Sequence, residues 1–295
     1  MVSQVGTITA DLKRGGTLYR LRHVVSRSIL YVGLIGWAAI TTYPFVWLVL
    51  TSLKYPFEVF DNPLGLPRDW VFENYVTAWT QAGVGRLAQN SLYVAVISTV
   101  LAMFVAATTS FALSRFNFRL KSPIFVYIMF GFMVPGSVLL VPLAVFTRRI
   151  GLYDSLLGLA IVYAAIGVPW NTFFLSAFMA TIPRELEEAA VIDGAGMWRV
   201  FWSVILPLSR PGLVTLATLH TLSSWNEFIL ALLLTISLEN RTLPVGMSLL
   251  IAQFYANYPA LAAAVVMSLV PSVLFFLLLQ RYVVEGLAAG ALVGL

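Results

Sequence analysis

One stretch of the sequence places polar side chains at a helical spacing inside an otherwise apolar run. The positions follow the pattern i, i+3, i+4 and i+7, which is one face of a helix. They are His220, Ser223, Ser224 and Glu227, with Asn226 at the flank. Carboxylate, amide and hydroxyl groups can replace the water that hydrates sugar hydroxyls, and an aromatic ring such as Trp225 can support a sugar's apolar face. The candidate substrate-path residues are therefore His220, Ser224, Trp225, Asn226 and Glu227.

Three other interpretations of this stripe stay open. Its side chains can hydrogen-bond to neighbouring helices without meeting a substrate. Glu227 and His220 can instead form the proton relay of a proton-coupled secondary carrier, whose uptake a protonophore would abolish while ATP is maintained. An intramembrane enzyme would need a paired acid and base, and only Glu227 with His220 qualifies, two turns apart. We assign no catalytic residue.

Composition narrows the class of protein. Of 295 residues, 60% are apolar and 11% are charged, and no cysteine is present. The two histidines, His23 and His220, have no metal-ligand spacing between them, so no metal site is expected. The net charge of +5 comes from basic residues at the ends of apolar runs, which argues for membrane topology and against a nucleic-acid partner.

Six mainly apolar runs are long enough to cross a bilayer, which takes about 20 residues in a helix, and Glu227 is the one charged residue within them. Strand-length alternation is missing, so the predicted fold is an all-α integral membrane domain of six transmembrane helices. The runs are Ile29 to Leu53, Leu87 to Leu113, Ile124 to Phe146, Leu156 to Ala180, Leu213 to Ile236 and Leu261 to Leu279.

Six spans put both termini on the same side of the membrane. With the termini in the cytoplasm, the inner segments carry about twice as many Lys and Arg residues as the outer ones, as the positive-inside rule requires. We therefore expect a cytoplasmic N-terminal segment at 1–28, a membrane domain at 29–281 with a cytoplasmic loop at 181–212, and a cytoplasmic tail at 282–295.

Several further features belong to the outer half and to the spans. The outer segment from Lys54 to Arg86, rich in Pro and Trp, is interpreted as an interfacial lid. Pro135, Gly136 and Pro142 are expected to kink or open the third span, with simple helix packing as the alternative. Asn90, at the outer end of the second span, is expected to cap the helix, with a sugar contact as the alternative.

The 181–212 loop predicts a helix, a turn and a second helix. Pro183 suits a first turn, and the acidic residues that follow it favour the positive end of the helix dipole. Gly194 and Gly196 interrupt the helix, and an amphipathic piece from Met197 to Leu206 follows. Acidic and small side chains are thus available to fit a partner's groove.

This loop resembles the E-A-A loop of ABC importer permeases. The matching residues are Glu188, Ala189, Ala190, Asp193, Gly194, Ala195, Phe201, Ile205, Leu206 and Pro207. The resemblance extends from about Tyr31 to Gly290 and is to sugar-importing permeases of the maltose-transporter type. It includes Trp225-Asn226-Glu227-Phe228 and Thr242-Leu243-Pro244-Val245-Gly246.

The resemblance implies a type I ABC importer permease that works with partners. These are a second, similar permease, two ATP-binding subunits that hold ATP and Mg, and an extracytoplasmic sugar-binding protein that delivers the sugar. The implied ATPase-coupling residues are Glu188, Ala189, Ala190, Asp193, Gly194, Ile205 and Pro207. The implied binding-protein contacts are Leu243, Pro244 and Gly246.

The chain lacks the G-x-x-x-x-G-K-[ST] phosphate loop, so energy must come from the partner ATPase. The family's basic residue near the C-terminus is missing from Ala291 to Leu295.

Overall fold

A computed structural model describes the backbone of residues 2–81, 83–253 and 257–293. Side chains are described for residues 27–81, 83–250, 257–277 and 280. All regular secondary structure in these ranges is helical. The expected segments at 1–28 and 282–295 thus lie almost wholly outside the described side chains. Their backbones continue the helices α1 (Val2–Ser52) and α14 (Tyr258–Val293).

Four of the six predicted spans are confirmed as continuous apolar helices. They are α1, α4 (Val84–Arg115), α7 (Leu156–Ala180) and α14. The other two predicted spans are not single straight helices.

The third run is broken where the sequence predicted a kink. It consists of α5 (Lys121–Met133) and α6 (Gly136–Arg149), which meet at an angle of 99°. Val134 and Pro135 between them are extended, because a residue before proline avoids the helical region and proline has no amide to donate. Pro142 lies inside α6.

The fifth run departs from the prediction of one helix from Leu213 to Ile236. Here α11 (Arg210–Asn226) ends early, Glu227 is extended, and a short helix α12 (Ile229–Leu234) follows. The expectation of a continuous span was wrong because the Glu227 carboxylate binds backbone amides of α12 and so stabilises a new helix start.

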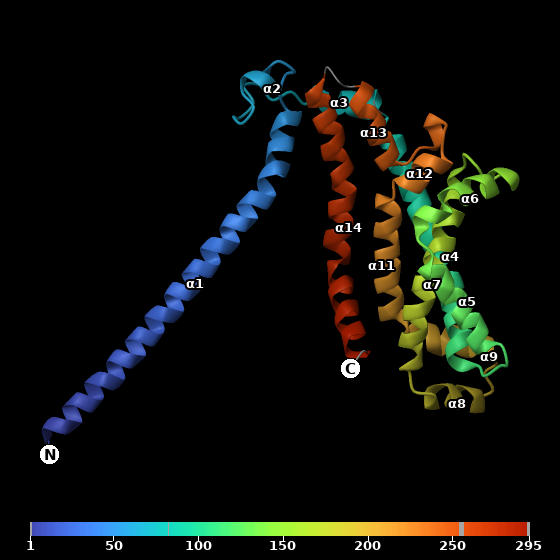
Figure 1. Cartoon of the computed structure of the whole chain (residues 1–295), viewed down its shortest axis with the longest axis horizontal. Coiled ribbons are helices and arrows are strands. Elements are labelled where there is room, and N and C mark those ends of the chain that lie inside the picture. Colours follow the sequence, from blue (N-terminus) through green and yellow to red (C-terminus); the bar gives the residue numbers. More distant parts are fainter. Residues whose placement is uncertain (1, 82, 254–256, 294–295) are drawn as a thin grey trace.

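The helices form a bundle with two distinct ends (Figure 1). Helices α4, α7 and α11 pack together, α5 lies against α7, and α14 lies against α11. Fully buried alanines on α4, such as Ala95, Ala102 and Ala106, allow close helix approach. We call the end with α8 (Glu185–Ile192) and α9 (Met197–Val200) the inner end. The opposite end, with α6, α12 and α13 (Leu243–Gln253), is the outer end.

Helix α1 diverges from the bundle in the direction of the inner end (Figure 1). It contacts α14, but none of its most apolar window is buried within the chain. Its surface is therefore available to lipid or to another protein.

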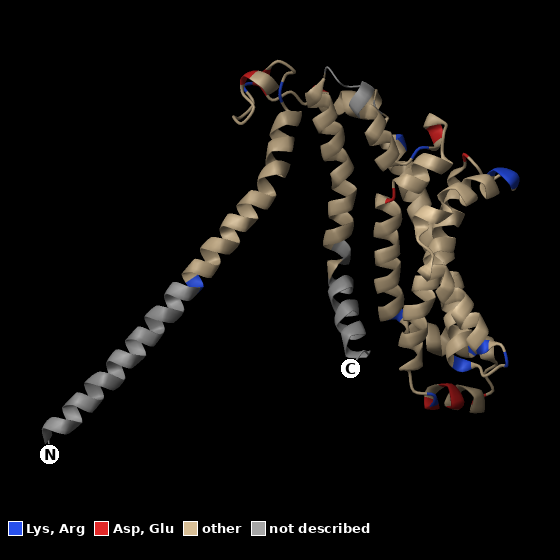
Figure 2. Cartoon of the chain, in the orientation of Figure 1, with Lys and Arg blue, Asp and Glu red and all other residues tan. Residues whose placement is uncertain are grey.

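Charged residues lie mainly at the two ends of the bundle, and most of its length is uncharged (Figure 2). This distribution is typical of a protein whose middle faces hydrocarbon.

The outer segment between α1 and α4 folds around buried polar groups. It contains α2 (Glu58–Asp61) and α3 (Glu73–Thr80). The Lys54 ammonium donates to the carbonyl of Asn62 at 2.5 Å, and Glu58 accepts the amide of Arg68 at 2.8 Å. Asn74 donates to the carbonyls of Ser52 and Lys54. This segment is thus a structured unit at the outer end of the bundle.

Candidate functional site

The 181–212 loop forms the predicted helix, turn and helix at the inner end. Helix α8 carries three glutamates in its first turn, and α9 continues into a π-helix (Phe201–Ile205) and α10 (Leu206–Leu208). A π-helical turn is frequently found at functional sites. A bend of 74° near Ser209 then leads into α11.

The predicted coupling residues divide into two groups. Ala190 and Ile205 pack into an inner-end apolar cluster with Phe111 and Phe201. The others are exposed and free to contact a partner: Glu188, Ala189, Asp193, Gly194 and Pro207. At Gly194 the backbone has φ of +84°, which residues with a side chain rarely adopt, and open space surrounds the missing Cβ.

Sequence reasoning missed the apolar part of this surface. Ile192 is 85% exposed and Trp198 is 69% exposed, beside the acidic residues of α8. Exposed apolar side chains rimmed by charge are typical of protein-binding surfaces. The sequence signal that could have revealed these two residues is that they lie in a polar loop, where apolar side chains are not needed for packing against other spans.

A second missed feature is an ion pair that joins α8 to α4. Arg115 Nε lies 2.6 Å from Glu187 Oε1, and Arg115 Nη2 donates to the carbonyl of Ile182 at 3.0 Å. The two side chains are 5% and 15% exposed. A cavity of about 390 Å³ opens beside this pair.

The predicted polar stripe is divided by the structure into a buried and an exposed part. His220 lies against α7, with Nδ1 3.5 Å from Asn171 Nδ2. Gly167 makes room for the imidazole, because a Cβ there would lie 2.4 Å from His220 Cε1. Ser224 Oγ accepts from Ser98 Oγ of α4 at 3.2 Å. His220 and Ser224 therefore connect helices of this chain.

Trp225 and Glu227 also have structural partners. The Trp225 indole donates to Ser272 of α14 at 3.0 Å. The Glu227 carboxylate accepts the amides of Leu230 at 2.9 Å and Ala231 at 3.0 Å, together with the hydroxyl of Tyr163. In this conformation Glu227 caps α12.

Asn226 differs from the other four candidate path residues because it remains exposed. Its amide donates only to the carbonyl of Leu222, one turn earlier, and Ser223 is exposed on the same side of α11. Of the candidate path residues, Asn226 is thus the one most available to a substrate.

The outer loop between α12 and α13, residues 235–242, is fixed by side chains of other elements. Asn90 of α4 donates to the carbonyls of Glu239 at 2.8 Å and Arg241 at 2.9 Å. Asn90 therefore anchors this loop, and the expectation that it caps α4 was wrong because it lies beyond the first turn and its amide is directed to distant carbonyls.

Asp154 fixes the same loop from the α6–α7 connection. Its carboxylate accepts the amides of Ile236 at 2.8 Å and Ser237 at 3.1 Å, and the Ser237 hydroxyl at 2.7 Å. Burial opposes the charged form, but the hydrogen bonds from Ser237 and Ile236 outweigh it and lower the pKa of Asp154. Its φ of 54° is tolerated best by Asn, Asp and Gly.

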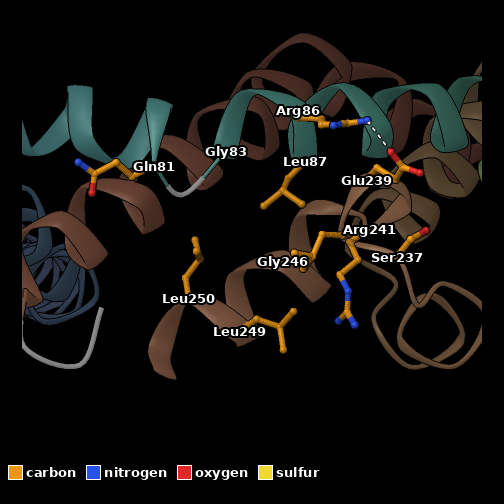
Figure 3. Close-up of a pocket in the computed structure, with 11 residues that line it drawn as sticks. Gln81, Gly83, Arg86, Leu87, Ser237, Glu239, Arg241, Gly246, Leu249 and Leu250 are labelled. Atoms are coloured by element: carbon orange, nitrogen blue, oxygen red, sulfur yellow. Dashed lines mark ion pairs between the residues drawn. The ribbon is translucent and has the colours of Figure 1, made fainter. Parts of the chain in front are cut away.

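A pocket of about 580 Å³ lies between the outer loop, α4 and α13 (Figure 3). Arg86 and Glu239 form an exposed ion pair of 3.5 Å at its edge, and Arg241 also lines it. Of the predicted binding-protein contacts, Gly246 lines the pocket but is buried against Leu87, Leu243 is 2% exposed, and Pro244 is half-buried. The most exposed apolar residue of this loop is Leu238, at 76%. Among the described residues, no three His, Asp or Glu side chains are grouped as a metal site.

The fold and these sites define a multi-pass helical membrane protein with a structured loop at each end. Residues 98–288 match the family described as the binding-protein-dependent transport system inner membrane component. The chain belongs to this family.

Curated relatives of similar length support the assignment. The diacetylchitobiose uptake system permease protein NgcG of Streptomyces coelicolor is 36% identical, over 87% of this chain and 86% of the relative. The arabinooligosaccharides transport system permease protein AraQ of Halalkalibacterium halodurans is 30% identical, over 90% and 96%. The chain is thus a permease component and not an enzyme.

A solved structure shows the same fold. A chain of a bacterial ABC transporter involved in the import of the acidic polysaccharide alginate superposes with a TM-score of 0.75 at 23% identity, covering 86% of this chain and 95% of that chain. The fold is therefore that of an ABC importer permease.

We predict that Asp154→Gly loosens the outer loop, since glycine keeps the backbone conformation but removes the acceptors. A loss of about 1.5 kcal/mol of local stability, the lower end of the range for a hydrogen bond to a charged group, raises amide exchange at Ile236 and Ser237 about tenfold. Hydrogen exchange measured by mass spectrometry checks this. The control Asp154→Asn keeps one oxygen acceptor and should lose less protection.

The same loop should respond to acid in a defined direction. Because the folded pKa of Asp154 is lowered, its stabilisation is complete above the ordinary value of about 3.9 and is lost as pH falls through the lowered pKa. Protection that stays constant through strong acid, or equal protection in Asp154→Gly and the wild type, would contradict the assigned role.

Proposed function

We propose that the chain is one permease half of an ATP-driven, binding-protein-dependent importer of sugars or oligosaccharides. The observation that carries the proposal is the similarity, over most of the chain, to permease proteins named for diacetylchitobiose and arabinooligosaccharide uptake. The exposed acidic and apolar surface of α8 provides the second support.

Coupling to ATP is assigned to the inner-end loop. Helix α8 docks into a cleft of an ATP-binding subunit, with Glu188 and Ala189 facing the partner and Ile192 adding apolar contact area. Two such subunits bind ATP and Mg and supply the energy. A surface that combines small, acidic and apolar side chains suits a groove in a protein partner.

The inner end is assigned to the cytoplasm, and with it the terminal segments 1–28 and 282–295. The support is the excess of Lys and Arg that this orientation gives to cytoplasmic segments. The outer loop and its pocket then face the sugar-binding protein, with Leu238 as the exposed apolar contact.

The substrate path is assigned to the exposed side of α11, with Asn226 facing sugar and a second permease closing the path. The other four candidate path residues hold α11 and α12 in position through their contacts within this chain. They are His220, Ser224, Trp225 and Glu227. A proton relay through Glu227 is disfavoured, because its carboxylate is occupied by a hydroxyl and two amides.

The coupling surface is tested by crosslinking, which the absence of native cysteine makes simple. Ala189→Cys should crosslink to the ATP-binding subunit in the assembled importer, with a yield that changes when nucleotide binds. Asn117→Cys, in the exposed loop after α4, serves as the control position. No crosslink from Ala189 or its exposed neighbours in an active complex would remove the basis of the proposal.

Gly194 tests whether the turn after α8 must keep its left-handed backbone. Gly194→Val should cost about 1–2 kcal/mol in strain and reduce the ATP-binding subunit that copurifies, whereas Gly194→Asn should retain most of it. Equal loss in both variants would instead indicate that the partner leaves no room for any side chain.

Asn226 tests the substrate path. Asn226→Ala should lower sugar transport about tenfold, since losing hydrogen bonds of about 1.4 kcal/mol in total has that effect on binding. Ser224→Ala, which removes only an interhelical bond, should transport nearly normally per assembled complex. Normal transport by Asn226→Ala, with unchanged sugar preference, would show that α11 does not face the sugar.

A further inference from the structure

Helix α4 differs from the other membrane-spanning helices in having no interruption. It runs from Val84 to Arg115 without a proline, a length of about 48 Å. Within the described parts of the chain, α1, α7 and α14 each contain an internal proline, and the third and fifth runs are broken. Proline removes a backbone hydrogen bond and kinks a helix, so α4 is the stiffest connection between the two ends.

The inner end of α4 is fastened to the 181–212 loop. Arg115 pairs with Glu187 and also holds the carbonyl of Ile182. The other glutamates in the first turn of α8 are exposed, so Glu187 alone is directed to α4. One turn before Arg115, Phe111 packs on Phe201 of the π-helix with ring centroids 5.1 Å apart. A shielded ion pair next to an apolar contact constrains relative motion more than a surface ion pair does.

The outer end of α4 is fastened to the outer loop in a comparable way. Asn90 holds two loop carbonyls, and the Ser91 hydroxyl accepts the amide of Leu243 at 2.8 Å. Leu87 packs directly on Gly246, where a Cβ would lie 2.2 Å from a Leu87 methyl carbon. The start of α13 and the loop before it are therefore held on α4.

We propose that α4 is the rigid link that carries motion between the ATPase-coupling loop and the outer loop. Arg115 and Asn90 are the positioning residues that fasten its two ends. This inference rests on the proposed function, which supplies the partner that moves α8. When that partner shifts α8, the ion pair moves α4, and α4 carries the outer loop with it. The coupling is reciprocal, so a protein docking on the outer loop affects the ATPase through the same helix.

A probe on the outer loop tests the link without knowledge of the sugar. In the assembled complex with its second permease and ATP-binding subunits, Leu238→Cys supplies a single exposed thiol on this chain, and cysteine-free partner subunits make it the only one. Its rate of labelling by a maleimide, measured with and without a non-hydrolysable ATP analogue, reports motion of the loop. We expect nucleotide to change this rate at least threefold. No change would overturn the proposal.

Variants of the inner end then identify the route. Arg115→Glu and Glu187→Arg should each reduce the nucleotide-dependent change to less than a third, and the double charge swap should restore more than half of it. Arg119→Glu makes the same charge change in the exposed loop four residues later and should leave the nucleotide-dependent change unaltered. It controls for an effect of the charge change on membrane topology. A full response in the single variants, or no recovery in the double swap, would overturn the link.

Variants of both ends test whether they act on one element. Asn90→Leu should reduce the response as Arg115→Gln does, and the double variant should be no worse than the stronger single one. If the losses of response in the two single variants add in the double variant, the two ends act through separate routes, and the proposal is overturned. Crosslinking from Ala189→Cys is measured in a parallel series that lacks Leu238→Cys. Its absence without any further substitution counts against the proposed function, whereas normal crosslinking with an unaffected loop response counts against the link alone.

Discussion

The carboxylate of Glu227 holds the break between α11 and α12, and the arrangement of the outer end depends on that break. In an apolar medium an unpaired backbone amide costs several kcal/mol, so a helix can restart inside a bundle only where a side chain takes the freed donors. Glu227 accepts two of them, and the hydroxyl of Tyr163 completes its partners. The chain can then turn into α12 and reach the outer loop, whose backbone is hydrogen-bonded by Asp154 and Asn90.

The rest of the bundle is joined by small surfaces and weak polar contacts. Interhelical hydrogen bonds in membranes average about 0.6 kcal/mol, so Ser98 with Ser224 and Thr99 with Thr221 contribute modestly as individual pairs. The buried alanines of α4 allow close approach and van der Waals contact between the helices. An assembly held in this way has several hydrogen bonds at its ends and only weak polar contacts along its middle.

Local patterns were sufficient to predict four continuous spans, the bend in the third span and the helix of the inner loop. Hydropathy located the spans, Pro135 located the bend, and the acidic first turn located α8. The partners of Asn90, Asp154 and Glu187 could not be predicted, because each contact joins residues far apart in the chain and depends on how helices are rotated. The fifth span was misjudged for the same reason, since the hydropathy of residues 213–236 does not reveal that a carboxylate will cap a second helix.

The contact between Gly167 and His220 has a consequence for how such a chain can change over generations. The imidazole occupies the space that any side chain at position 167 would need, although the two positions lie on different helices. Position 167 is therefore not free to vary alone: a methyl group there becomes acceptable only after position 220 has become smaller. Substitution histories at the two sites should be linked, and the order in which the changes can occur is fixed by sterics.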